Sequence, residues 1–228
     1  ESEKEYVAGL RLGVETNTQD TTGTVLAERP VSVSQAELEQ VLGQFRGEIR
    51  QIPPMYSAIK INGQKLYDLA RKGREVERAP RPVTIHALEL EDRLGPDEFL
   101  LRVRCSKGTY VRTLCHDIGA ALGCGGCMSS LRRTMAAGFT LAHSVTLDTV
   151  LQAQDPAALL LPVDTYFAGY PDLVADPEQE KRIRNGAALP MPGLPDGRYR
   201  VYSQDGTFLA LSQGENGILT TVKSFYEV

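Results

Sequence analysis

Residues 99–122 read FLLRVRCSKGTYVRTLCHDIGAAL, and this stretch contains two kinds of regular structure. Leu101, Val103 and Cys105 fall at every second position, which is the pattern of a β-strand with one buried face. After the glycine turn, apolar residues recur every three or four positions over residues 110–122, as in an amphipathic helix. The stretch therefore predicts a strand that leads directly into a helix.

Other segments predict further strands of the same sheet. Residues 83–91 precede the strand at 99–105 and are joined to it by a turn that contains Gly and Pro. Residues 6–14 alternate between two faces, and a polar turn over residues 16–23 leads from them into residues 24–28 as a hairpin. We expect the pair 83–91 and 99–105 to form the centre of the sheet.

Helix and turn signals divide the rest of the first half of the chain. Ser34 and Glu37 form a capping box, and apolar residues follow at helical spacing, which predicts a helix over residues 35–45. Asn62-Gly63 is typical of a tight turn, and a short basic helix is expected after it. The sequence therefore predicts a small turn-and-helix insertion between the strands.

The character of the chain changes beyond Pro162. Helices are predicted at residues 146–152 and near residues 177–185. Three short strands separated by glycine-containing turns are then expected at residues 198–202, 208–211 and 219–225. The predicted class is α+β, with a mixed, mainly antiparallel sheet flanked by helices in residues 1–165 and a small β domain in residues 166–228.

Composition excludes several classes of protein. The 228 residues, 42% hydrophobic and 24% charged, are those of an ordinary globular chain, and no apolar run approaches the length of a membrane-spanning helix. Four cysteines do not form a disulfide framework, so we expect reduced thiols and a cytoplasmic location. Cys124 and Cys127 form a CxxC pair without further ligands at suitable spacing, which favours small buried thiols over a metal site.

Charge is distributed unevenly along the chain. The formal net charge is -4, yet residues 60–81 carry seven basic residues against three acidic ones, and residues 102–133 carry six against one. A cationic surface on an acidic protein binds a polyanion such as RNA locally, and such binding weakens with salt. The alternative is a solvated helix face together with scattered strand arginines.

The turn between the strand and the helix at residues 99–122 is a candidate site. Backbone amides at the start of a helix favour an anion, and Lys107, Tyr110 and Arg112 are placed to line such a site. The alternative is that Tyr110 belongs to the core and that the cations are exposed.

Two more positions have competing interpretations. Arg132 and Arg133 lie in an apolar neighbourhood, so one of them is expected to point inward and to need a carboxylate or phosphate partner. Tyr6, in the first strand, either belongs to the core or stacks on a nucleic acid base. His116 is interpreted as a hydrogen-bonded structural residue and Asp20 as a turn former, and no catalytic set emerges from spacing alone.

In their order along the chain, several of these motifs resemble the bacterial TruB-type tRNA pseudouridine-55 synthases. The matching segments are Tyr6 with residues 10–13, the turn at 16–23, QIPPMYSA at 51–58, KLY at 65–67 with Ala70, Arg71 and Gly73, SKGTYVR at 106–112, and LRR at 131–133. Each motif is modest alone, but their order over residues 6–147 is specific.

The resemblance implies isomerisation of the uridine at position 55 of the tRNA T-loop to pseudouridine, without a metal or an organic cofactor. It implies that Tyr6 stacks on the flipped base and that Arg132 pairs with the catalytic aspartate. Lys107, Tyr110 and Arg112 would lie beside the cleft and bind RNA.

The resemblance also implies RNA-binding parts outside this site. Residues 55–82 correspond to a thumb-like insertion that clamps the tRNA T-arm, and residues 166–228 resemble a small PUA-like RNA-binding domain. The thumb residues expected to bind RNA are Lys60, Lys65, Arg71, Lys72 and Arg74. The protein is expected to be a monomer that needs no protein partner.

One part of the family pattern has no match in residues 1–228. The nucleophilic aspartate of the family lies in a Thr-Gly-Thr-Leu-Asp-Pro type of segment before the strand that holds Tyr6, and neither Asp20 nor Asp117 has that context. These residues alone are therefore expected to be catalytically inactive. The alternative function is a non-catalytic RNA-binding or RNA-folding module.

Overall fold

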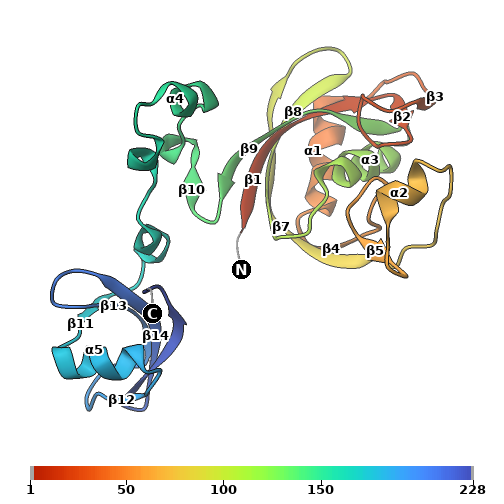
Figure 1. Cartoon of the computed structure of the whole chain (residues 1–228). Helices are drawn as coiled ribbons and strands as arrows, with labels where there is room; N and C mark the ends of the chain where they lie inside the picture. Colours follow the sequence, from red (N-terminus) through yellow and green to blue (C-terminus); the bar gives the residue numbers. More distant parts are fainter. Residues whose placement is uncertain (1–2, 227–228) are drawn as a thin grey trace. The chain divides into compact units, whose positions relative to one another are not determined.

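The computed structural model describes residues 3–226, and the chain divides into two compact units, residues 1–144 and 145–228 (Figure 1). The division falls earlier than the predicted boundary at residue 165. Residues on both sides of position 165 contact strands of the second unit. The Tyr202 hydroxyl donates a hydrogen bond to Asp164 (2.7 Å), and the Phe167 ring contacts the rings of Phe208 and Phe225.

The first unit contains a six-stranded sheet in the order β10-β9-β1-β8-β7-β4, and all its neighbouring strands are antiparallel. The strands are β1 (Lys4–Leu12), β4 (Gly47–Gln51), β7 (Arg81–Arg93), β8 (Glu98–Cys105), β9 (Gly126–Ala136) and β10 (Phe139–Thr140). The predicted pairing of β7 with β8 is confirmed, but the centre of the sheet is β1 and β8. The α+β class is as predicted.

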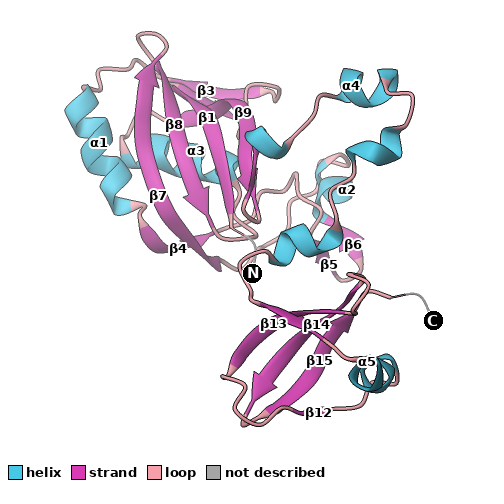
Figure 2. Ribbon diagram, turned by 90° about the vertical axis from the view of Figure 1, so that its left-hand side faces the viewer, coloured by secondary structure: helices cyan, strands magenta, loops and turns pink. Residues whose placement is uncertain are grey.

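Helices α1 (Gln35–Gln44) and α3 (Val111–Ala121) lie on one face of this sheet (Figure 2). The predicted capping box of α1 is present, since the Glu37 amide donates to the Ser34 hydroxyl and the Ser34 amide to the Glu37 carboxylate. The core between the helices and the sheet is fully buried. Its members include Leu10, Leu38, Leu42, Ile85, Phe99, Leu101, Val103, Leu114 and Ile118.

Helix α3 approaches the start of β9 without an intervening side chain. A Cβ atom at Gly119 of α3 would lie 2.2 Å from the amide nitrogen of Gly126 in β9, so only glycine fits at this helix position. The close approach seats α3 directly on the sheet. It thereby holds the last turn of α3 against the start of β9.

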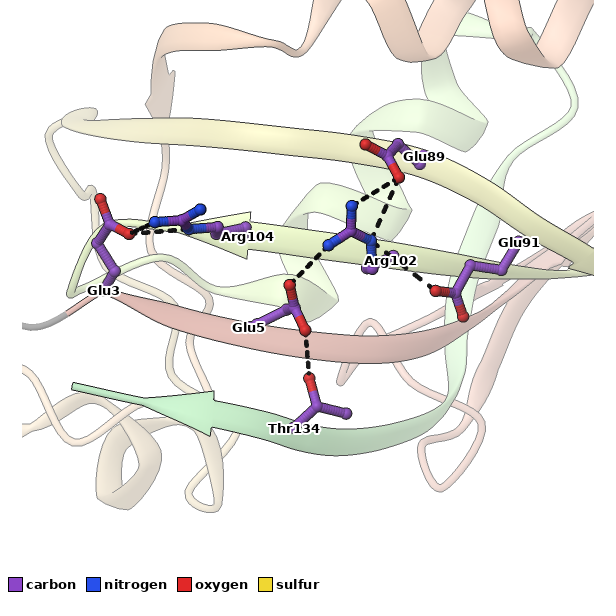
Figure 3. A network of polar contacts seen from close by, with 7 residues as sticks. All are labelled: Glu3, Glu5, Glu89, Glu91, Arg102, Arg104 and Thr134. Atoms are coloured by element: carbon purple, nitrogen blue, oxygen red, sulfur yellow. Dashed lines mark hydrogen bonds and ion pairs between the residues drawn. The ribbon is translucent and has the colours of Figure 1, made fainter. Parts of the chain in front are cut away.

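The opposite face of the sheet carries a network of charged side chains instead of helices (Figure 3). Arg102 donates to Glu5 and to Glu89 at 2.8 Å each, and the Arg104 Nε donates to Glu3 at 2.8 Å. Along β8, Arg102 and Arg104 alternate with buried residues, as expected of an antiparallel sheet with one solvated face. Ion pairs across neighbouring strands thus cover the face that lacks helices.

A small insertion leaves the sheet at Gln51 and returns at Arg81, and these two residues are register partners in β4 and β7. It contains β5 (Lys60–Ile61), β6 (Gln64–Lys65) and α2 (Leu66–Ala70). The predicted turn is confirmed, because Asn62 and Gly63 both adopt positive φ, 50° and 79°. We call residues 52–80 the thumb.

Strands β2 (Val14–Thr16) and β3 (Val25–Glu28) form a hairpin that is a separate two-stranded sheet. The predicted hairpin joined residues 6–14 to residues 24–28, but β1 pairs with β8 and β9 instead, and of those residues only Val14 pairs with β3. The turn between β2 and β3 reaches the large sheet. The Thr21 amide donates to the Met128 carbonyl (2.9 Å), and the Met128 amide donates to the Gln19 carbonyl (3.0 Å). This hairpin turn therefore lies beside β9.

The second unit is built on a five-stranded sheet in the order β11-β13-β14-β15-β12. The strands are β11 (Asp172–Val174), β12 (Leu189–Pro190), β13 (Gly197–Tyr202), β14 (Phe208–Glu215) and β15 (Ile218–Ser224). The helices α4 (Leu147–Gln152) and α5 (Pro177–Arg184) and the strands β13 to β15 agree with the predicted segments. Within residues 3–226, no helix is long and apolar enough to cross a membrane.

Candidate functional site

Arg112 connects three separate segments of the first unit. It lies in the first turn of α3, and its guanidinium donates to the Asp20 carboxylate through Nη1 (3.1 Å) and to the Tyr56 carbonyl through Nη2 (3.0 Å). The side chains of Arg112 and Asp20 are 27% and 14% exposed. Arg112 is therefore a largely buried arginine with a carboxylate partner.

The Asp20 carboxylate is held from several sides. One of its oxygens, Oδ1, accepts hydrogen bonds from the Thr22 amide (3.0 Å), the Thr22 hydroxyl (2.6 Å) and the Thr18 hydroxyl (2.8 Å). Burial acts to raise the pKa of Asp20, but the hydrogen bonds from Thr22, Thr18 and Arg112 outweigh it and lower this pKa. Asp20 is a turn former, as predicted, and its ion pair with Arg112 is an additional feature that local sequence did not indicate.

Tyr110 precedes the first turn of α3, and its backbone is paired with the side chain of Gln51. The Tyr110 amide donates to Gln51 Oε1 (3.0 Å), and Gln51 Nε2 donates to the Tyr110 carbonyl (3.2 Å). Lys107 and Tyr110 line a cavity of about 360 Å³, together with Gln51, Pro53, Ile59, Arg81, Pro82, Val83 and Gly108. The candidate turn after β8 thus borders an open pocket beside the thumb.

Tyr6 is partly buried on the helix-covered face of the sheet. It lies near the start of β1, which pairs with the last residues of β8. Burial and the neighbouring Cys105 raise the pKa of its hydroxyl, and Arg133 partly offsets this rise. Arg133 is the register partner of Tyr6, and Leu131 is the register partner of Ala8, which points to the same side of β1 as Tyr6. Arg133 and Leu131 therefore lie on the same face of the sheet as Tyr6. Leu131 is 46% exposed, which leaves an accessible apolar surface close to Tyr6.

Arg132 does not lie with Tyr6. Its register partner is Val7, and successive residues of a strand point to opposite faces, so Arg132 is on the face that carries the charged network. Both Arg132 and Arg133 are exposed. The expectation that one arginine of this pair points inward is therefore wrong, because β9 is a strand whose second half is solvated on both faces.

The predicted basic residues of the thumb are mostly exposed, as a nucleic acid contact requires. Lys65 is partly engaged, because its ammonium donates to the Tyr67 hydroxyl (2.9 Å), and the Arg71 guanidinium lies 5.3 Å from the centre of the Tyr67 ring. Lys60, Lys65 and Lys72 line a common cavity of about 390 Å³. Arg74 lines a second cavity of about 330 Å³.

The structure also corrects the charge argument and bears on two smaller expectations. Arg102 and Arg104, which contribute to the basic excess of residues 102–133, are ion-paired with glutamates on the face away from Tyr6. The Nδ1 atom of His116 is buried without a hydrogen-bond partner within residues 3–226, so this nitrogen does not make the hydrogen bond expected of His116. All four cysteines are buried free thiols, as predicted.

Two family descriptions match the chain. Residues 1–111 match the N-terminal domain of the TruB family of pseudouridylate synthases, and residues 112–168 match the C-terminal domain of tRNA pseudouridylate synthase B. The chain is 48% identical over 223 residues to tRNA pseudouridine synthase B of Azoarcus sp. (strain BH72), covering 96% of this chain and 73% of that protein. It is 38% identical over 230 residues to the Clostridium kluyveri protein of the same name, covering 99% and 79%.

Solved structures with a similar fold are more distant in sequence. One, described as a Cbf5-Nop10-Gar1 complex, has a TM-score of 0.65 at 23% identity and covers 98% of this chain and 66% of that one. Another, an H/ACA RNP bound to a substrate RNA containing 2'-deoxyuridine, has a TM-score of 0.66 at 20% identity and covers 99% and 66%.

The α+β fold and the two family matches define the class as pseudouridylate synthases. The chain belongs to the TruB family of pseudouridylate synthases.

Proposed function

We propose that the protein isomerises a uridine of tRNA to pseudouridine and that the uridine is the one at position 55 of the T-loop. The observation that carries the proposal is the 48% identity, over 96% of this chain, to a protein named tRNA pseudouridine synthase B. The reaction is proposed to need no metal or organic cofactor and no protein partner. We also propose a monomer in a reducing, cytoplasmic compartment, which suits four buried free thiols.

The proposed reaction takes place on a base that has left its stack. A base inside folded RNA is inaccessible, and extrusion from the stack requires a few kcal/mol, which stacking and hydrogen bonding in the pocket offset. Tyr6 and the exposed Leu131 share a face and offer the apolar surface for this base. Tyr110 and Lys107, which line the cavity at the root of the thumb, are proposed to contact the RNA.

Arg112 replaces Arg132 in the proposed mechanism. An arginine that orients a catalytic carboxylate must be held in place and must share the face with the bound base. Arg112 satisfies the first condition through Asp20 and Tyr56, and α3 covers the face on which Tyr6 lies. Arg132 is exposed on the other face.

Asp20 is a poor candidate for the nucleophile. Its carboxylate already accepts three hydrogen bonds from threonines and one from Arg112, which lowers its reactivity and its pKa. We therefore propose that the nucleophile is the aspartate of the family segment that residues 1–228 do not match. Asp20 is proposed to act through Arg112.

RNA binding is proposed to come mainly from the first unit. Residues 145–228 contain six Lys and Arg but eleven Asp and Glu, so their net charge opposes a polyanion. The thumb, by contrast, presents Lys60, Arg71, Lys72 and Arg74 to solvent. A PUA-like role in RNA binding for residues 166–228 would then depend on local contacts and not on overall charge.

The test is pseudouridine formation in a tRNA transcript, measured by mass spectrometry of nuclease fragments. The full-length protein is expected to convert the T-loop uridine, and a transcript with cytidine at that position serves as the control. Residues 1–228 alone are expected to bind the transcript without converting it. RNA binding without conversion by the full-length protein would favour the alternative function, a non-catalytic RNA-binding module.

A further inference from the structure

We propose that Gln51 is a positioning residue that fixes the start of α3 and so sets the directions of Tyr110 and Arg112. The inference rests on the proposed function, in which both residues belong to the site. Gln51 itself is not proposed to touch the base, because both polar atoms of its side chain are bonded to the Tyr110 backbone.

The pairing of Gln51 with Tyr110 joins segments that are 59 residues apart. One carboxamide accepts from the Tyr110 amide (3.0 Å) and donates to the Tyr110 carbonyl (3.2 Å). Two opposed hydrogen bonds to one residue fix both the position and the orientation of its backbone. Gln51 is 2% exposed, so water does not compete for these bonds.

Tyr110 needs this external support because it caps α3 poorly. Tyr110 is the N-cap residue, with φ −99° and ψ 105°, and its side chain makes no capping hydrogen bond. Its carbonyl also accepts the first helical hydrogen bond, from the Leu114 amide (3.0 Å). The direction of the first turn therefore depends on the Tyr110 backbone, and Arg112 lies in that turn.

The far end of the same loop is fixed independently. The Ser106 hydroxyl accepts from the Thr84 amide (2.9 Å), and the Thr109 hydroxyl donates to the Ser106 carbonyl (2.9 Å). Gln51 holds the end of the loop that leads into the helix. Removal of the Gln51 side chain would thus loosen the helix start without releasing the whole loop.

Gln51 also stands where the thumb begins. It is the last residue of β4, and five residues later the Tyr56 carbonyl accepts a hydrogen bond from Arg112 (3.0 Å). The segment from Gln51 to Tyr56 is therefore bound to the start of α3 at both ends. A movement of the thumb root would be transmitted to Arg112, and Gln51 is the buried end of this connection.

The chemistry of the pairing gives a specific test, Gln51→Glu. An ionised carboxylate still accepts from the Tyr110 amide but repels its carbonyl, whereas a protonated carboxyl donates to that carbonyl as the amide does. Burial raises the pKa of such a carboxyl above its ordinary value of about 4.3, while Arg81, the register partner of residue 51, and Lys107, which lines the same cavity, act to lower it. The variant is therefore expected to be impaired at neutral pH and to recover toward wild type as the pH falls.

The measurements are the kcat of pseudouridine formation and the tRNA affinity of the full-length protein, each between pH 5.5 and 8.5. For Gln51→Glu we expect a decrease in kcat on the order of 10- to 100-fold at the upper pH, as for a displaced catalytic group. Its tRNA affinity should fall by less than its kcat, because the thumb cations are unchanged, and the ratio of its kcat to that of wild type should rise as the pH falls. Gln44→Glu, at the exposed end of α1, introduces the same charge and should match wild type throughout.

A second readout does not depend on catalysis. In Gln51→Ala, hydrogen exchange at the Tyr110 amide should accelerate, while amides in β1 and β8 keep their protection. A kcat equal to that of wild type at every pH, or unchanged exchange at Tyr110, would overturn the positioning role. Absence of isomerisation by wild type would instead refute the proposed function, and the exchange result would still decide whether Gln51 holds the helix start.

Discussion

The guanidinium of Arg112 lies 3.1 Å from the carboxylate of Asp20, although 92 residues separate the two. The pair attaches the first turn of α3 to the hairpin turn that lies beside β9. With the bond from Arg112 to the Tyr56 carbonyl, the hairpin turn, the thumb root and the helix start meet at one side chain. Changes at this side chain should therefore affect the chemistry more than RNA binding.

Arg112→Ala should lower the rate of pseudouridine formation by at least about 100-fold, since a group that orients a catalytic carboxylate acts through geometry. Binding of the T-arm should change by less than about fivefold, because several thumb cations remain. The matched control is Arg132→Ala, on the opposite face of the sheet, which should retain nearly full turnover. The reverse result, with Arg132 essential and Arg112 dispensable, would assign the orienting role to Arg132.

Asp20→Asn should make the free energy of unfolding less dependent on pH in the acid range. The folded-state pKa of Asp20 is lowered, so its carboxylate contributes stability above its unfolded pKa of 3.8, and this contribution disappears as the pH falls through the lower folded value. Urea unfolding of wild type and Asp20→Asn between pH 2 and 5 measures the effect. Equal pH dependence in the two proteins would show that the hydrogen bonds around Asp20 do not favour its charged form.

Removal of charge at Arg71, Lys72 and Arg74 together should weaken T-arm binding and reduce its dependence on salt. For each phosphate that is no longer neutralised, the slope of log K against log salt becomes shallower by about 0.7 to 0.9. Lys181→Ala with Lys223→Ala, at two exposed lysines of the acidic second unit, is the control and should leave the slope unchanged. An unaltered slope in the thumb variant would mean that this part of the thumb does not touch phosphate.

Gly119→Ala and Gly43→Ala should change stability in opposite directions, although both add one methyl group within a helix. At Gly119 the new Cβ would lie 2.2 Å from the Gly126 backbone, so α3 must shift, at a cost of about 1–3 kcal/mol or more. At Gly43, in α1, the new Cβ would have no atom within 4 Å apart from the backbone of its own helix, so alanine should stabilise the helix by about 0.5–1 kcal/mol. Denaturant unfolding measures both, and a common sign would contradict the close packing of α3 on β9.

Local sequence patterns predicted those elements whose signals lie within a few residues. The capping box at Ser34 and Glu37, the turn at Asn62-Gly63 and the alternation in β8 each depend on neighbouring side chains, and each is confirmed. Strand β9 was not predicted, because its first half is buried and its second half is solvated on both faces, which leaves no alternation. Without that strand, the face on which Arg132 lies could not be assigned.

Long-range pairs account for the rest of what the sequence did not reveal. The partners of Arg112 are 92 and 56 residues away, and the partner of Gln51 is 59 residues away. No local pattern in the sequence reveals such pairs, because they form only when the fold brings β4, α3 and the hairpin turn together. Lys107, Tyr110 and Arg112 could nonetheless be identified as a candidate site, since a strand end followed by a helix start is visible in sequence.

The thumb departs from the sheet and returns to it at Gln51 and Arg81, which face one another across β4 and β7. An insertion with adjacent ends can lengthen or shorten without moving the strands that hold it. Doubling such a loop changes the free energy of its closure by only about 0.6 kcal/mol. The fold can therefore accommodate thumbs of different sizes while the register of the strand that carries Tyr6 stays the same.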